Sequence, residues 1–138
     1  MTSLVSLQSP ISQRASGAFT LRHADGCHYL FGWTGKWLRQ LSGRALRDHD
    51  FITLWRPADR AFLQAQLDDV RRYGRARTIK ARAVTLCGES RLCSFEFTKL
   101  EHPKGRGATM GCRWRSHANA AQPGTPIAQL RLDANPTH

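Results

Sequence analysis

The sequence has few acidic residues and no long apolar run. Of its 138 residues, 10 are Asp or Glu and 21 are Lys or Arg, which gives a formal net charge of +11. Such a chain is attracted to polyanions, including nucleic acids and acidic proteins. A membrane-spanning helix needs roughly 18 consecutive apolar residues, and no run approaches that length. We therefore expect no membrane span and, because no signal peptide is evident, a cytoplasmic location.

Cysteine patterns typical of metal or disulfide sites are also missing. The cysteines Cys27, Cys87, Cys93 and Cys112 form no CxxC pair, and the histidines do not complete a zinc-finger spacing. We expect reduced thiols and no structural metal. Cys93 and Cys112 fall on the inward faces of neighbouring predicted strands, where a redox pair is one reading, but buried inert thiols are the favoured one.

Signals for catalysis are equally scarce. The sequence contains no phosphate-binding glycine loop and no nucleophile elbow. Asp68 and Asp69 are adjacent, so they point to different sides of a helix and do not form a carboxylate pair. The sequence therefore predicts a protein that is not an enzyme.

The length and a hydrophobic fraction of 41% indicate one globular domain with tails. Residues 1–16 read as a flexible N-terminal arm, 17–117 as the domain and 118–138 as a flexible C-terminal tail. Within that tail, 127-IAQLRL-132 has no clean period, but it could form a docking turn.

The domain begins with a predicted hairpin and ends with a predicted meander. Alternating apolar residues indicate strands over 18–22 and 28–33, with a turn at 25–26. Helices are expected over 34–43 and 58–74, with a short apolar element over 50–55. Three strands over 76–86, 91–100 and 108–117, with a first turn at 88–90, should pair antiparallel. This order predicts an α+β fold, with a roughly five-stranded antiparallel sheet and helices packed on one face.

The helix over 58–74 has clear start and stop signals. Asp59 should cap its N-terminus, and Gly74 should end it after Arg71 and Arg72. Its apolar stripe is expected to face the sheet. The stripe comprises Phe62, Leu63, Leu67 and Val70.

This pattern resembles the PAS domain family over residues 17–117. The passages 35-GKWLRQLSGRALRDHDF-51 and 54-LWRPADRAFL-63 carry the likeness, and they look like the short stand-alone PAS domains of alphaproteobacteria. The resemblance implies a sensory or protein-interaction module of bacterial signal transduction, with its output domain supplied in trans. Its expected partners are a signalling protein or a second copy of the chain, and a small molecule could occupy the interior.

The cofactor that the resemblance implies is unknown. Flavin-binding relatives carry an Asn-Cys-Arg-Phe-Leu-Gln motif, which this sequence lacks, and haem-binding relatives usually offer a histidine from the long helix, which contains none. His28 could ligate a metal from a strand, but without a second ligand it is more simply a residue at the rim or in the core.

Two candidate surfaces follow from the predicted sheet. The inner face, including a possible ligand cavity, comprises Trp37, Trp55, Phe62, Ala81, Ala83 and Phe95. The two alanines are expected opposite Phe95 and Phe97, where they either leave room for a ligand or let a filled core pack closely, and the filled core is favoured.

The outer face is expected to bind a partner or a polyanion through Arg22, Lys80, Arg82, Arg113 and Arg115. A plain solvated basic face is the simpler alternative. The rival function is nucleic-acid binding through this face. Because the strand aromatics alternate toward the other side, where bases cannot stack on them, the sequence predicts only weak, non-specific nucleic-acid binding.

Overall fold

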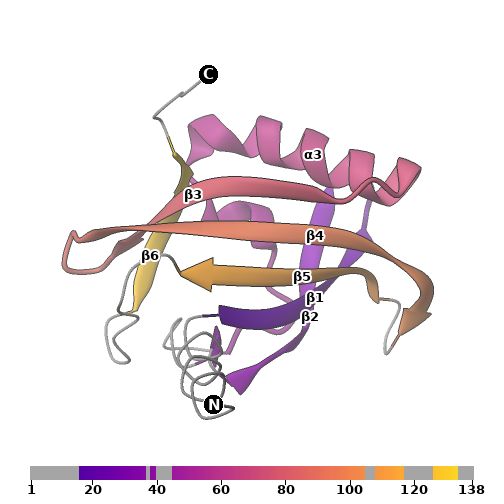
Figure 1. The fold of residues 1–138 in the computed structure, drawn as a ribbon, viewed down its shortest axis with the longest axis horizontal. Helices are drawn as coiled ribbons and strands as arrows, with labels where there is room; N and C mark the ends of the chain where they lie inside the picture. Colours follow the sequence, from indigo (N-terminus) through magenta and orange to yellow (C-terminus); the bar gives the residue numbers. More distant parts are fainter. Residues whose placement is uncertain (1–15, 37, 40–44, 105–107, 117–125, 134–138) are drawn as a thin grey trace, which may run out of the picture.

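The structure is a computed structural model that describes residues 16–36, 38–39, 45–104, 108–116 and 126–133. Its elements are β1 (Ser16–Ala24), β2 (His28–Thr34), the 3-10 helices η1 (Phe51–Leu54) and η2 (Pro57–Asp59), α3 (Arg60–Tyr73), β3 (Arg77–Thr85), β4 (Ser90–Lys104), β5 (Ala108–Ser116) and β6 (Ile127–Leu132). The strands form one 6-stranded sheet in the order β2-β1-β5-β4-β3-β6 (Figure 1), and α3 contacts β4 and β5 of this sheet. The predicted α+β class is confirmed, with one strand more than expected.

The β1 and β2 hairpin forms where the sequence predicted it. Ala24 pairs with His28 across a three-residue turn over 25–27, in which Asp25 and Gly26 both have positive φ angles, 50° and 77°. β1 also pairs antiparallel with β5, and this contact joins the hairpin to the three-strand meander. The predicted helix over 34–43 is only partly described: residues 36, 38 and 39 are helical, and the rest of its second half lies outside the described residues.

The predicted flexible tail is wrong over residues 127–132. This segment is strand β6, which pairs antiparallel with β3 through the register Leu130 with Ala83 and Leu132 with Ala81. Leu130 is fully buried. The segment gave no clean period because the register of the β3 and β6 ladder shifts between Val84 and Thr85. Ile127 and Leu132 both pack against the core although an odd number of positions separates them, and this masks the two-residue repeat.

One chain segment covers both outer edges of the sheet. At the β2 edge, the Phe31 N–H donates to the His49 carbonyl at 2.9 Å and the Asp48 N–H donates to the Phe31 carbonyl at 2.8 Å. At the β6 edge, the Arg56 N–H donates to the Leu130 carbonyl at 2.7 Å. Residues 48–56 therefore connect the first and last strands of the sheet, and these backbone groups are closed to strand addition by another chain.

Helix α3 packs on the sheet through a narrower stripe than the sequence predicted. Leu63, Leu67 and Val70 are fully buried, whereas Phe62 is 47% exposed and Tyr73 is 69% exposed. At 100° per residue, Phe62 and Tyr73 project within about 20° of each other, on a different side of the helix from Leu63. The prediction that Phe62 faces the sheet is wrong, because its neighbour Leu63 occupies that direction.

The C-terminal end of α3 is capped as predicted, but its N-terminal end is not. Gly74 has a φ of 74°, and its N–H donates to the Val70 carbonyl at 2.9 Å, which is a glycine C-cap. Asp59 stands at the N-cap position, but its side chain makes no cap hydrogen bond. Instead the carboxylate accepts from the Leu132 N–H of β6 at 2.9 Å and from the Arg56 guanidinium. The carboxylate therefore binds the last strand rather than the helix.

The β3 and β4 register also differs from the prediction. Phe95 lies opposite Ile79, and Ala81 lies opposite Cys93, so the alanines do not face Phe95 and Phe97 directly. A turn at 88–90 would have given the predicted pairs. The observed turn is two residues earlier, closed by the Gly88 N–H donating to the Thr85 carbonyl at 2.9 Å. A shift of two residues changes the partners but leaves every side chain on its predicted face.

Candidate functional site

The interior of the sheet collects four of the six predicted cavity residues. Trp55, Ala81, Ala83 and Phe95 are all buried. The Trp55 and Phe95 rings are 5.4 Å apart, and Trp55 forms an isolated bridge with Leu130, the β6 partner of Ala83. The other two predicted members are Trp37 and Phe62. Trp37 lies outside the described residues, and Phe62 is on the exposed side of α3.

Aromatic rings fill the inner face around these residues. Phe51 is the centre, with ring centroids 5.6 Å from Phe19, Phe31 and Phe95 and 5.8 Å from Phe97. It comes from η1, whose N-cap Asp50 accepts a hydrogen bond from the Ile52 N–H at 3.0 Å. Edge-on ring contacts of this kind add stabilisation beyond their buried area. The geometry favours the filled core that the sequence analysis preferred.

One polar atom in this interior has no partner. Trp55 is 0% exposed to solvent. Its indole Nε1 has no hydrogen-bond partner. A buried donor without an acceptor costs about 1–3 kcal/mol. Among the described residues, the Trp55 N–H is therefore a donor to which a carbonyl, carboxylate or ring nitrogen could bind.

A polar cluster that the sequence analysis missed connects β2 with α3. The Tyr29 hydroxyl donates to Asp68, and Arg71 Nε donates to the Tyr29 oxygen at 3.1 Å. Arg71 also pairs with Asp68 at 3.6 Å. Burial, and then the hydrogen bond to Asp68, raises the pKa of Tyr29 to about 12. Helical spacing places Asp68 beside Arg71, but nothing in the sequence indicates that a tyrosine almost forty residues earlier completes the group.

His28 lies at the rim of the fold and binds a carboxylate. Its Nδ1 is 2.7 Å from Asp50 Oδ2, and its side chain is 48% exposed. This hydrogen bond raises the pKa of His28 above its ordinary value. Within the part of the chain that the structure describes, no group of three or more His, Cys, Asp or Glu residues gathers as a metal site.

Cys93 and Cys112 are buried, as the favoured reading predicted, while Cys27 and Cys87 are exposed. Cys112 lies opposite Phe97 in the β4 and β5 ladder, four residues along β4 from Cys93. That places the two thiols about 13 Å apart along the strands, too far for a disulfide. Burial raises the pKa of Cys93 to about 12 and that of Cys112 well above its ordinary value, so both are held as unreactive thiols.

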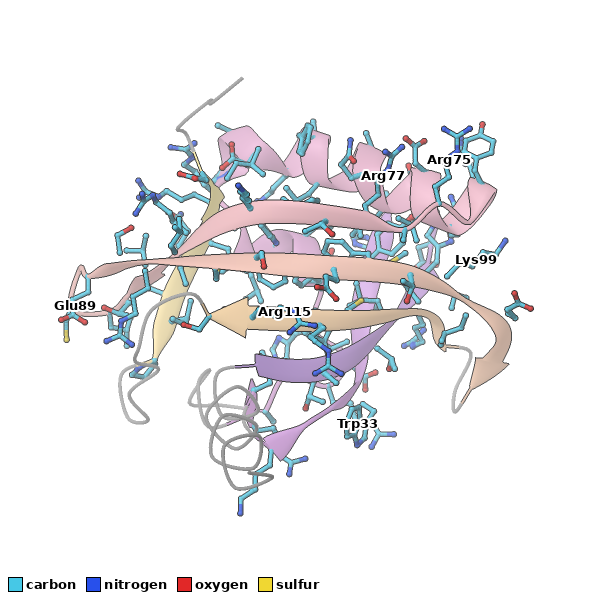
Figure 2. All side chains as sticks on the ribbon, viewed as in Figure 1. Trp33, Arg75, Arg77, Glu89, Lys99 and Arg115 are labelled. Carbon is cyan, nitrogen blue, oxygen red and sulfur yellow. The ribbon has the colours of Figure 1, made fainter. Side chains whose placement is uncertain are left out.

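The outer face of the sheet brings together four of the five predicted basic residues. Lys80 lies opposite Ser94, and Ser94 lies opposite Arg115, so the two cations share one row across three strands, about 10 Å apart. Arg82 and Arg113 occupy the adjoining rows on either side. Figure 2 shows Arg115 near the middle of the sheet, with Glu89 and Lys99 toward the two ends of β4.

Acidic side chains reduce the positive charge of this face. Arg115 Nε donates to Glu96 at 2.8 Å, and Arg82 pairs with Asp133 at 3.3 Å. Arg22 is not part of the group, because it lies four residues along β1 from the partner of Arg113 and pairs with Asp48 at 3.5 Å. Trp33 is 61% exposed on β2, on the opposite side of the view from α3 (Figure 2).

The order of the elements matches a known family. A family model described as a PAS domain matches residues 10–105, which is more than half of the chain. The chain belongs to the PAS domain family. PAS domains are sensory modules typical of signal transduction. The curated proteins contain no match to the chain.

Solved PAS structures share this fold at low identity. The PAS domain of a Colwellia psychrerythraea protein is 11% identical, with a TM-score of 0.56, and the match covers 85% of this chain and 98% of that one. A sensory box histidine kinase/response regulator from Burkholderia thailandensis E264 is 16% identical, with a TM-score of 0.50 and coverage of 80% and 83%.

An RNA-binding light-oxygen-voltage receptor is also similar in fold. It is 19% identical, with a TM-score of 0.53, and the match covers 74% of this chain. This chain corresponds to only 28% of that receptor's length. At these identities the likeness shows the fold alone.

The cofactors known in PAS domains find little support from the residues present. The side chains that α3 turns toward the sheet are Leu63, Leu67 and Val70, none of which can ligate a haem iron. A flavin ring would have to replace rings that already contact one another around Phe51. In the described ranges, no helix is long and apolar enough to cross a membrane.

Proposed function

We propose that this PAS domain is a non-enzymatic interaction module of bacterial cytoplasmic signalling that acts by binding a protein partner. The observation that carries the proposal is the aromatic interior centred on Phe51, whose ring contacts the rings of Phe19, Phe31, Phe95 and Phe97. A large cofactor could enter only by separating these rings. A filled interior of this kind favours a domain that binds a partner at its surface over one that binds a chromophore in its core.

The proposed contact surface is the outer sheet face around Lys80, Arg82, Arg113 and Arg115. Three of these side chains are exposed, and that of Arg82 is 40% exposed. A net charge of +11 favours a partner whose contact surface is acidic, or a second copy that pairs basic with acidic groups such as Glu96.

Contact at this face would act by shifting the packing between the sheet and α3. Two connections described above can carry the shift. Asp59, at the start of α3, binds β6, and Asp68, in the middle of α3, binds β2 through Tyr29. Both ends of the sheet are therefore attached to the same helix.

Native mass spectrometry of the freshly purified chain tests the proposal. We expect the mass of the 15.5 kDa polypeptide or of its dimer, without a small molecule. A retained small molecule would overturn the interaction module in favour of a ligand sensor. The variant Trp55→Phe then reports on the site, because loss of that molecule from the variant alone would place its acceptor beside the Trp55 indole N–H.

A further inference from the structure

The border between β3 and β6 places two arginines directly opposite each other. Arg82 and Arg131 are Cα partners in the antiparallel ladder. Their neighbours Ala81, Ala83 and Leu130 are buried on the inner face, so both arginine side chains lie on the outer face. Like charges directly opposite in a sheet destabilise it. The protein retains this pair at the edge strand that closes its sheet.

Arg131 contributes a buried donor to this border. In the part of the chain that the structure describes, its Nε is buried without a hydrogen-bond acceptor. A buried charged donor without an acceptor is costly. Arg131 was missed by the sequence analysis because its segment was assigned to a tail.

Two further groups complete the surroundings. Lys80 lies two residues before Arg82 on the same face of β3, and its side chain is exposed. Asp133 follows β6 and lies beside Lys80, because the Asp133 N–H donates to the Lys80 carbonyl at 3.2 Å. Asp133 pairs with Arg82 Nε at 3.3 Å, and Arg82 Nη1 donates to Ser90 Oγ at 3.5 Å. Three cations and one carboxylate leave two positive charges in excess.

We propose that Arg82, Arg131 and Lys80 form a binding site for a phosphoryl group that bridges β3 and β6. A phosphate monoester carries a charge of about −1.5 to −2 near pH 7 and three acceptor oxygens, which matches this excess charge and supplies acceptors beside the unpartnered Arg131 Nε. Guanidinium groups bind phosphate through paired N–H donors, and an ammonium adds a point charge. This inference goes beyond the proposed function, because a free phosphorylated molecule satisfies it without any protein partner.

The site is built from both strands, so occupancy is linked to the attachment of β6. A ligand that binds only when β6 is paired with β3 stabilises that pairing by mass action. Phosphate should therefore raise the melting temperature of the full chain above its value in chloride at equal ionic strength. It should also slow hydrogen exchange at the amides of β6.

Substitutions distinguish a binding role from a structural one. Arg131→Gln should abolish the phosphate-dependent rise in melting temperature and weaken phosphate binding about tenfold or more, and Arg131→Lys should retain part of it. In phosphate-free, low-salt buffer, Arg131→Gln should be at least as stable as the wild type, because it removes the like-charge pair. Arg75→Gln, at an exposed site near the end of α3 (Figure 2), is the matched control and should keep the full phosphate response.

Two outcomes overturn the proposal. One is a phosphate effect no larger than that of chloride, and the other is an equal phosphate effect in Arg131→Gln and Arg75→Gln. The source of the phosphoryl group is identified by comparing the affinities of the chain for inorganic phosphate, for a phosphoserine peptide and for the unphosphorylated form of that peptide. Tighter binding of the phosphopeptide than of inorganic phosphate indicates a phosphorylated protein, and similar affinities indicate a free phosphorylated molecule. These readouts do not depend on the mass spectrum that tests the interaction module.

Discussion

The Asp59 carboxylate accepts a hydrogen bond from the Leu132 backbone N–H at 2.9 Å, across 73 residues of sequence. Asp59 is 7% exposed and also binds the Arg56 guanidinium. The same carboxylate thus fixes the last strand against the start of α3. A residue that reads as a helix cap from the sequence is instead the attachment point of β6.

Replacing Asp59 should therefore detach β6 rather than fray α3. Asp59→Ala leaves the Leu132 N–H and the Arg56 guanidinium without their acceptor, so we expect a loss of about 2 kcal/mol or more in the free energy of unfolding. Urea unfolding measures the total, and hydrogen exchange measures the location. Exchange should accelerate at Leu132 before it does in α3.

The matched control for this change is Asp69→Ala. Asp69 also pairs with an arginine, Arg77 at 3.3 Å, but its side chain is 42% exposed. An exposed pair contributes less than about 1 kcal/mol. If the two variants lose the same stability, or if α3 exchanges first in the Asp59 variant, the assignment of Asp59 to β6 is wrong.

The two phenylalanines Phe51 and Phe62 should respond oppositely to the same substitution. Phe51→Ala removes the centre of the aromatic cluster from a fully buried site and should cost about 3–5 kcal/mol. Phe62→Ala changes a side chain that is 47% exposed and should cost about 1 kcal/mol or less. Thermal or urea unfolding provides the comparison. Equal losses would mean that Phe62 contacts the core.

Stability should fall in alkaline solution, partly through Tyr29. Its pKa is about 12 in the folded chain against an ordinary value of 10.0, so the folded state holds the phenolic proton more tightly than the unfolded state does. The stabilisation from this group is complete below about pH 10 and is lost as the pH rises toward about 12, and it amounts to at most about 3 kcal/mol.

Urea unfolding at a series of pH values checks this, with Tyr29→Phe as the comparison. The variant lacks the titrating hydroxyl, so its alkaline loss of stability should be smaller than that of the wild type. Cys93, with its pKa also raised to about 12, contributes a loss of the same sign in both proteins. The same alkaline slope in both proteins would exclude Tyr29 as a source.

Nucleic-acid binding should be weak and should disappear at physiological salt. The outer face carries Arg113 and Arg115 but also Glu96, and the aromatic residues of β4 and β5 lie on the inner face. Fluorescence anisotropy with single-stranded RNA across a salt series measures the affinity. Nanomolar binding that survives physiological salt, and that is lost when Arg82, Arg113 and Arg115 are replaced by Glu, would favour the rival nucleic-acid function.

The sequence alone predicted the parts of the fold that depend on local pattern. The turn at Asp25 and Gly26, the end of α3 at Gly74 and the inward faces of β3, β4 and β5 all follow from turn chemistry and from two-residue alternation. The buried state of Trp55, Ala81, Ala83 and Phe95 followed from the same alternation. A two-residue error in the β3 and β4 turn did not affect these faces, because side-chain direction repeats every two residues.

Tertiary structure decided the rest, because the deciding contacts join residues far apart in the chain. Local spacing could not show that Leu63 rather than Phe62 would face the sheet, that Tyr29 would bind Asp68, or that Asp59 would bind β6. It also could not pair Arg131 with Arg82, since that contact exists only once β6 adds to the edge of β3. The sequence by itself determined which segments form strands and helices over most of the domain. Which side chains meet across them was settled by packing between segments, where burial and backbone hydrogen bonding outweigh local preference.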